Sequence, residues 1–365
     1  MRIGILTLPL HTNYGGILQA YALQAVLKRM GHEAILLDRG WLKRGFVRDL
    51  LSRIKWDCKS LISSKNLITP QLQEKMGLRI RGFIRNYINP RAEIRTISDI
   101  KRLNLEAIVV GSDQVWRKHY SPRNITFYYL DFAKQWNIKR LAYAASFGIE
   151  DWDYTPEQTL LCKELLEKFV AVSVREDSGK KLCKEYLNRE AEVLLDPTLL
   201  LEAGDYKKMI LMDEEPIKGN LFCYVLDKNH KVQDIIGGVA EKLAYKPFYI
   251  DGGDSFSTVG IKPSVECWLK GFADAKFVVT DSFHGCVFSI IFNKPFLVYG
   301  NEKRGKTRFV SLLSKFGLED RLITSVDEID MKVKKAIDWR YVNERLIMFR
   351  QESLIFLETN LSKNL

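Results

Sequence analysis

The chain has 365 residues, of which 46% are hydrophobic and 28% are charged. This composition is typical of a globular protein and excludes a disordered chain, a collagen or a disulfide-rich miniprotein. The length predicts two domains. The longest uncharged apolar run, Cys286–Asn293, is far shorter than the roughly 20 residues that a membrane-spanning helix needs.

The cysteines and the first residues favour a cytoplasmic protein. The six cysteines form no C-x-x-C pair and lie inside apolar runs, so buried reduced thiols are expected. No small-residue cleavage site follows the apolar run at the start of the chain. We therefore interpret that run as a strand and not as a signal peptide.

The positive charge is concentrated in one segment. The net charge is +11, and residues 41–101 contribute +9 of it, with 14 Lys or Arg against 5 Asp or Glu. A basic segment can attract nucleic acid, a membrane surface or anionic substrates. Because the rest of the chain is close to neutral, this charge is a local feature.

The first residues predict the start of a parallel α/β sheet. Ile3–Leu8 is an apolar run that ends in a polar turn containing Gly15 and Gly16. Apolar residues then recur at helical spacing as far as Met30, and Ala34–Asp38 is predicted to be the next strand. A strand, a helix and a second strand in this order are typical of a parallel sheet.

Strands and helices continue to alternate along the chain. The other predicted strands are Glu106–Val110, Arg140–Ala144, Val170–Val174, Val193–Leu195, Leu221–Leu226, Pro247–Ile250, Phe277–Thr280 and Pro295–Tyr299. The other predicted helices are Pro156–Phe169, Ser178–Asn188, Lys231–Leu243, Ser264–Phe272, Gly285–Phe292 and Trp339–Leu361. This order predicts an α/β protein of the GT-B-like class, with two Rossmann-like domains facing a cleft and a C-terminal helix.

The predicted domains follow from this pattern. We expect an N-terminal domain over residues 1–196, with the basic segment 41–101 inserted in it. A C-terminal domain is expected over residues 197–338, and the final helix over residues 339–365. Parallel sheets bind ligands beyond the carboxyl ends of their strands, so the turns at those ends are the candidate functional sites.

The turn Thr280–Gly285 is the most informative of these strand ends. It joins an apolar strand to a helix start, where unpaired N–H groups favour anions. Asp281 and Ser282 are good N-cap residues, so capping alone would explain them. His284 is a candidate functional residue, although a purely structural histidine remains an alternative.

Three other strand ends carry polar side chains. Arg175 would either bind an anion or pair with a neighbouring acid. Asp113 would either function in a site or cap a turn. Gln114 and Trp116 suggest a saccharide site, because aromatic rings pack on sugars and amide groups bind sugar hydroxyls. The basic loop Gly300–Arg308 would be either solvated or an anion site.

Several familiar cofactor and catalytic motifs are missing from the sequence. It contains no G-x-G-x-x-G, no P-loop and no G-x-S-x-G, and its five histidines are scattered without metal-ligand spacing. We therefore expect neither a nicotinamide cofactor nor a metal site.

Five motifs, taken together, resemble the polysaccharide pyruvyl transferase family. They are Asn13–Ala20, Gly111–Trp116, Ser173–Ser178, Thr280–Gly285 and Arg308-Phe309, and the resemblance extends over about residues 1–325. It implies a GT-B-like fold and transfer of an enolpyruvyl unit from phosphoenolpyruvate to a sugar. That sugar would belong to a surface polysaccharide or its lipid-linked precursor, and the products would be a cyclic pyruvate ketal and phosphate.

The resemblance also implies roles for residues at matching positions. The donor site would contain Arg175, Ser282, Phe283, His284, Gly285, Arg304 and Arg308. The acceptor site would contain Asn13, Tyr14, Gly15, Gly16, Gln114, Trp116 and Ser146. His284 is the expected general acid beside Arg175, and Asp113 is our hypothesis for the base; no cofactor is implied beyond phosphoenolpyruvate as a substrate.

The sequence departs from the family at the donor turn. Members whose turn reads Arg-Leu-His have arginine where this chain has Ser282 and leucine where it has Phe283. One cation for the anionic donor is therefore missing at this turn. Lys303, Arg304 or Arg308 could supply it.

The basic segment has two open interpretations. Its apolar residues recur at four-residue steps between basic ones, at Leu42, Phe46, Leu50, Ile54 and Cys58. Such a helix could bind an anionic membrane surface through residues 41–65, at the inner face of the membrane where lipid-linked acceptors would lie. Alternatively, it packs on its own domain and exposes its charges.

Two other functions remain as alternatives. The first is a GT-B glycosyltransferase that uses a nucleotide sugar. The second is a non-catalytic binder of an anionic polymer through residues 41–101, which also contain interspersed aromatic residues. The chain has no known nucleic-acid-binding motif, so nucleic acid is not an expected partner.

Overall fold

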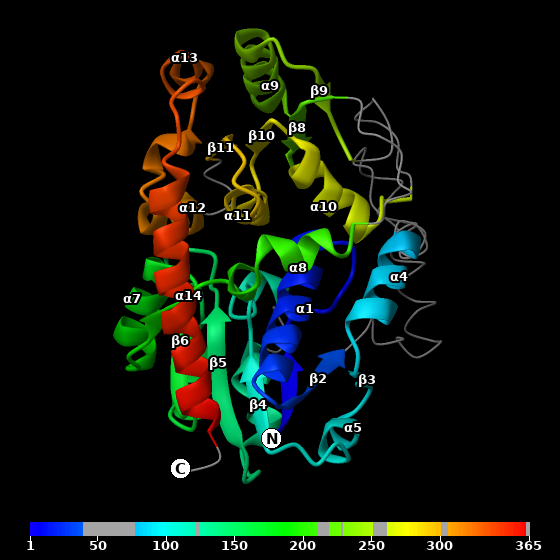
Figure 1. Ribbon diagram of the computed structural model, residues 1–365. Coiled ribbons are helices and arrows are strands. Elements are labelled where there is room, and N and C mark those ends of the chain that lie inside the picture. Colours follow the sequence, from blue (N-terminus) through cyan, green and yellow to red (C-terminus); the bar gives the residue numbers. More distant parts are fainter. Residues whose placement is uncertain are drawn as a thin grey trace, which may run out of the picture.

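The computed structural model describes residues 1–38, 77–121, 125–210, 219–227, 229–250, 261–300 and 306–362. The predicted basic helix over 42–58, the segment 41–65 as a whole, Lys303 and Arg304 lie outside these described residues. Two parallel sheets lie one above the other, each flanked by helices, which confirms the predicted α/β class (Figure 1).

Among the described residues, the first sheet has seven strands in the order β3-β2-β1-β4-β5-β6-β7. All of its pairings are parallel. The strands are β1 (Arg2–Leu6), β2 (Glu33–Asp38), β3 (Arg91–Glu93), β4 (Ala107–Val110), β5 (Lys139–Ala145), β6 (Ala171–Val174) and β7 (Glu192–Val193). We call this sheet and its flanking helices the first unit. The central strand β4 is apolar and buried throughout, as expected for a sheet covered on both faces.

The second sheet has five strands within the described ranges, in the order β12-β11-β10-β8-β9. Its pairings are also all parallel. The strands are β8 (Leu221–Tyr224), β9 (Pro247–Phe248), β10 (Phe277–Thr280), β11 (Phe296–Tyr299) and β12 (Leu322–Ile323). We call this sheet and its helices the second unit.

Helices connect successive strands in both units. In the first unit they are α1 (Tyr14–Arg29), α4 (Leu78–Tyr87), α5 (Ile97–Lys101), α6 (Pro156–Leu166) and α7 (Asp177–Leu187), and α8 (Ala203–Lys207) follows in the connection between the units. In the second unit they are α9 (His230–Leu243), α10 (Val265–Asp274), α11 (Phe283–Ile291), α12 (Lys306–Phe316) and α13 (Ile329–Lys332), and α14 (Trp339–Leu361) ends the described chain. None of the helices in the described part of the chain is long and apolar enough to cross a membrane.

The structure corrects two predictions near the candidate site. The loop predicted at Gly300–Arg308 is wrong in its last part, because α12 begins at Lys306 and contains Arg308 in its first turn. Helix α11 begins at Phe283, so His284 belongs to the first turn of the helix rather than to the loop before it. Regular helical backbone therefore holds both Arg308 and His284.

Aromatic rings from both units form the junction between them. The ring of Tyr14, at the start of α1, stacks on Trp268 of α10 with 5.3 Å between centroids. The Tyr14 hydroxyl donates a hydrogen bond to the Pro263 carbonyl at 2.9 Å. Trp268 in turn contacts Phe288 of α11, which also contacts Tyr206 of α8. These contacts fix the start of α1 against the second unit.

The last helix, α14, returns from the second unit to the first and ends near the N-terminus (Figure 1). Ser353 accepts a hydrogen bond from the Leu195 N–H at 3.2 Å, and the ring of Phe356 lies 6.3 Å from that of Tyr143 on β5. The chain therefore passes between the units twice, once after β7 and once along α14 itself.

We predict that α14 contributes strongly to the stability of the first unit. Phe356 is 4% exposed, so Phe356→Ala should lower the free energy of unfolding by about 3–5 kcal/mol through lost burial and a residual cavity. Ile355 is 52% exposed on the same helix, and Ile355→Ala should change it by less than about 0.5 kcal/mol. Urea denaturation followed by circular dichroism measures both; equal midpoints for the two variants would contradict this role.

Candidate active site between the two units

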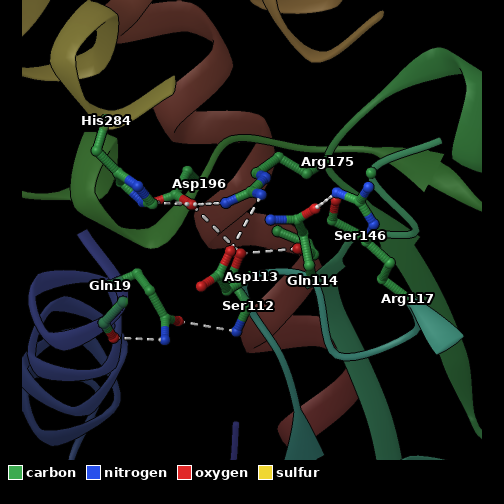
Figure 2. A network of polar contacts seen from close by, with 12 residues as sticks. Gln19, Ser112, Asp113, Gln114, Arg117, Ser146, Arg175, Asp196 and His284 are labelled. Carbon is green, nitrogen blue, oxygen red and sulfur yellow. Dashed lines mark hydrogen bonds and ion pairs between the residues drawn. The ribbon is translucent and has the colours of Figure 1, made fainter. Parts of the chain in front are cut away.

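Polar side chains from four neighbouring strand ends of the first sheet meet one from the second unit. Asp113 follows β4, Ser146 follows β5, Arg175 follows β6 and Asp196 follows β7, while His284 comes from α11 of the second unit (Figure 2). These residues converge because parallel strands end at the same edge of a sheet. The structure therefore brings polar side chains of both units together at this edge of the sheet.

Arg175 lies at the centre of this cluster and is 4% exposed. Its Nη1 donates to Asp196 Oδ2 at 2.8 Å, and its Nη2 donates to Asp113 Oδ1 at 3.3 Å. Its guanidinium also lies 4.2 Å from the ring centroid of Phe283. Burial alone would lower the pKa of Arg175, but Asp196 and Asp113 outweigh it and raise the pKa above its usual value.

Asp196 is the carboxylate that joins the two units. Its Oδ1 accepts hydrogen bonds from the N–H and hydroxyl of Thr198, and its Oδ2 accepts one from the Ser112 hydroxyl. The same Oδ2 lies 3.6 Å from Nε2 of His284, an ion-pair distance longer than a hydrogen bond. Burial opposes ionisation of Asp196, but His284 and Arg175 outweigh it and hold the pKa well below its usual value. Asp196 is therefore charged throughout the neutral pH range.

His284 fits against the first turn of α1 because residue 15 is glycine. A Cβ on Gly15 would lie 2.0 Å from Nδ1 of His284, a distance at which the ring would have to move. The side chain of His284 is 9% exposed. Among the described residues, its Nε2 is buried without a hydrogen-bond partner.

Asp113 has a backbone conformation that is uncommon for a residue other than glycine. Its φ is 67°, in the left-handed region, where Asp is tolerated better than most residues. Its carbonyl accepts hydrogen bonds from Val115 and Ser146, which hold the turn in place. Gln19 of α1 accepts a hydrogen bond from the N–H of Ser112 at 3.0 Å and so ties this turn to the first helix.

Glu176 is a second buried carboxylate beside the cluster. Its Oε1 accepts hydrogen bonds from the Ser146 hydroxyl and from the N–H groups of Phe147 and Gly148. Its Oε2 is buried without a hydrogen-bond partner among the described residues. Glu176 therefore fixes the turn after β5 and adds negative charge next to Arg175.

Arg308 supplies a second cation from α12. Its guanidinium carbon lies 6.0 Å from the ring centroid of Phe283, on which Arg175 also packs. Burial, together with the charge of Arg175, lowers the pKa of Arg308 to about 10. Arg308 thus remains protonated at neutral pH, and two guanidinium groups lie around one aromatic ring.

The structure does not support every predicted acceptor contact. Trp116 is fully buried, stacks on Tyr129 at 5.0 Å between ring centroids and donates its indole N–H to the Tyr128 carbonyl, so it offers no ring face to a sugar. Tyr14 is 3% exposed and is occupied by the junction with Trp268. Trp116 was predicted from its residue type and Tyr14 from the family resemblance, but packing and not recognition accounts for the positions of both.

The remaining predicted acceptor residues lie around the cluster with mainly structural contacts. Asn13 caps α1 by accepting a hydrogen bond from the Gly16 N–H at 3.2 Å, and Ser146 is fully buried against Glu176. Gln114 is 8% exposed and accepts a hydrogen bond from Arg117 at 2.8 Å. Figure 2 shows Gln114 and Arg117 on the side of the cluster away from His284.

Sequence reasoning missed Asp196 and Glu176 as site residues. Asp196 follows the predicted strand Val193–Leu195, which is the same signal that selected Arg175 and Asp113. Glu176 was considered only as a local partner of Arg175. Its actual partners are 28–30 residues away in sequence, which local spacing cannot reveal.

No group of three or more His, Cys, Asp or Glu in the described part of the chain has an arrangement that could hold a metal ion. The cluster instead combines two buried guanidinium groups with carboxylates and an imidazole. Its chemistry suits an anionic substrate together with proton transfer.

Comparison with solved structures shows the fold. UDP-GlcNAc 2-epimerase from Neisseria meningitidis bound to UDP-GlcNAc matches with a TM-score of 0.53 and 14% identity, covering 99% of this chain and 100% of that chain. The S. aureus MnaA-UDP co-structure matches with a TM-score of 0.52 and 12% identity, covering 99% and 97%. These similarities confirm the predicted GT-B-like fold. Because the sequence identities are only 12% and 14%, they say nothing about the substrates of this chain.

A search of curated proteins finds no match to the chain. Comparison with family models is more specific than comparison with solved structures. The model of the polysaccharide pyruvyl transferase family matches residues 13–303, which include Asp113, Arg175, Asp196 and His284. The chain therefore belongs to the polysaccharide pyruvyl transferase family.

Proposed function

We propose that this protein transfers a pyruvyl unit from phosphoenolpyruvate to a saccharide, forming a pyruvate ketal and releasing phosphate. The observation that carries the proposal is the buried cluster in which Arg175 and Arg308 lie around Phe283 while His284 lies next to Asp196. Two guanidinium groups suit a donor with a carboxylate and a phosphate. An adjacent imidazole suits the proton transfer that the reaction requires.

The reaction needs one proton delivered to carbon and two oxygen atoms added to the neighbouring carbon. A proton adds to the methylene carbon of phosphoenolpyruvate, and one acceptor hydroxyl attacks the carbon that bears the phosphate. A second hydroxyl then displaces the phosphate at that carbon and closes the ketal ring. The two hydroxyl protons are taken up by a base and by the leaving phosphate.

We assign the donor to the region of Arg175, Phe283 and Arg308. Residue 282, an arginine in some members of the family, is serine here and makes no side-chain capping hydrogen bond. Arg308 lies close enough to Phe283 to supply the missing cation from a different helix. The first turn of α11, with Phe283, His284 and Gly285, adds the favourable potential of a helix N-terminus.

His284 is the proposed general acid, and Asp113 is the proposed base toward the acceptor. A Cβ on Gly16 would lie 3.5 Å from Asp113 Oδ2, so this carboxylate oxygen lies near the start of α1. The acceptor would lie between the start of α1 and Gln114. A saccharide linked to a membrane lipid is one form that this acceptor could take. In that form, residues 41–65 would contact the inner membrane face of a cytoplasmic enzyme.

Thermal melting tests the donor class directly. Phosphoenolpyruvate should raise the melting temperature in a concentration-dependent manner, since a ligand that binds only the folded state stabilises it. A panel of UDP-sugars should give no comparable shift. The reverse result would favour the alternative of a nucleotide-sugar enzyme and would refute the proposed donor.

We predict that Arg175→Lys raises the KM for phosphoenolpyruvate by about tenfold or more, since a hydrogen bond to a charged group contributes about 1.5–3 kcal/mol and lysine lacks the planar fork of arginine. Arg140→Lys is the matched control, because Arg140 is also buried in the first unit but donates to backbone carbonyls, including those of Ala133 and Trp136. Steady-state kinetics with each folded variant measures the effect. An unchanged KM in Arg175→Lys would leave Arg175 with a structural role only.

We predict that His284→Ala lowers kcat/KM by at least about 10²-fold, since general acid catalysis typically contributes 10²–10⁴-fold. His284→Gln keeps a hydrogen-bond donor but cannot act as an acid near neutral pH, so it should be nearly as inactive. Calorimetry should show a much smaller change in donor affinity in both variants. A Gln variant with more than about a tenth of the wild-type kcat would exclude His284 as the acid, given that catalytic range.

A further inference from the structure

The imidazole of His284 is enclosed from two sides by residues of the other unit. On one side, Asp196 Oδ2 faces Nε2 at 3.6 Å. On the other, the ring covers Gly15 so closely that a Cβ there would lie 2.0 Å from Nδ1, 2.2 Å from Cγ and 2.7 Å from Cε1. The ring can occupy this position only because residue 15 has no side chain.

Neither side of this enclosure can shift easily. The carboxylate of Asp196 is held by Thr198 at one oxygen and by Arg175 at the other. Gly15 follows Tyr14, whose hydroxyl and ring are anchored to Pro263 and Trp268 of the second unit. The two contacts therefore define both the position and the orientation of the imidazole.

We propose that Gly15 and Asp196 are positioning residues that orient His284, with the ring proton kept on Nε2 facing Asp196 and the proton for the substrate delivered from Nδ1. The inference rests on the proposed function for its chemical step, but the orientation itself is a property of the protein without substrate. In that step Nδ1 loses its proton to the methylene carbon, and the ring becomes neutral with its remaining proton on Nε2. Asp196 stays ionised throughout and exchanges no proton.

The assignment of the two nitrogens follows from what faces each one. A carboxylate that faces a ring nitrogen favours the tautomer with the proton on that nitrogen, and the other nitrogen is then the one that exchanges protons. Nε2 is buried and lies 3.6 Å from the Asp196 carboxylate, whereas Nδ1 lies against Gly15 in the first turn of α1.

A substitution at Gly15 tests the positioning. Gly15→Ala should lower kcat at saturating phosphoenolpyruvate by about 10²-fold, because a displacement of a catalytic group by about 1 Å can cost that much, while the donor KM changes by only a few-fold. Gly82→Ala is the matched control, since Gly82 lies in α4 and a Cβ there would meet nothing within 4 Å. A Gly15→Ala enzyme with wild-type kcat would overturn the role of Gly15.

A spectroscopic measurement tests the orientation without any substrate. The chain has five histidines, so selective ¹⁵N labelling gives few ring signals, and the signal of His284 is the one that His284→Gln removes. At alkaline pH the neutral ring should carry its proton on Nε2, and Asp196→Asn should abolish that preference. A wild-type ring protonated on Nδ1, or an Asp196→Asn spectrum identical to wild type, would refute the role of Asp196.

These measurements separate this inference from the proposed reaction. If phosphoenolpyruvate neither binds nor reacts, the tautomer of His284 and its response to Gly15→Ala can still be read from the spectrum. If phosphoenolpyruvate reacts but the tautomer is Nδ1–H, the reaction stands and the positioning by Asp196 is wrong.

Discussion

The ion pair between Arg175 and Asp196 is almost completely withdrawn from water, with side-chain exposures of 1% and 0%. Burying two charges costs several kcal/mol for each, and their attraction offsets this only when the remaining hydrogen-bonding groups are also paired. Thr198, Ser112 and Asp113 provide most of that pairing. Loss of either charged partner would leave an uncompensated charge at the junction of the two units. The arrangement of the side-chain cluster and the stability of the fold therefore depend on the same ion pair.

The fold was largely predictable from the sequence because its signals are local. Buried parallel strands such as Phe277–Thr280 are short apolar runs that end in polar turns, and the buried residues of α14, such as Val342 and Leu346, recur at helical spacing. The short exposed strand Arg91–Glu93 has no such pattern, and it exists because it pairs with β2. Helix α12 was missed because its first turn has the composition of a basic loop.

The candidate site was only partly predictable, and the errors share one cause. Residue type and a position at a strand end identified Arg175, Asp113 and His284, all of which meet in the structure. The same reasoning selected Trp116, and the family resemblance selected Tyr14, but the burial of these rings depends on packing against Tyr129 and Trp268 elsewhere in the chain. Contacts between distant segments, which also determine the role of Asp196, leave no periodic trace in the sequence.

The chain passes between the units after β7 and again along α14, and this double connection restricts how the two units can move apart. Two units joined by a single connection can rotate relative to each other in any direction. When two separate connections join them, the easiest motion is rotation about the axis that passes through both connections. Rotation of one unit about this axis would draw the ring of His284 away from Gly15 in a fixed direction. Each closure would therefore return the ring to Gly15 along the same path.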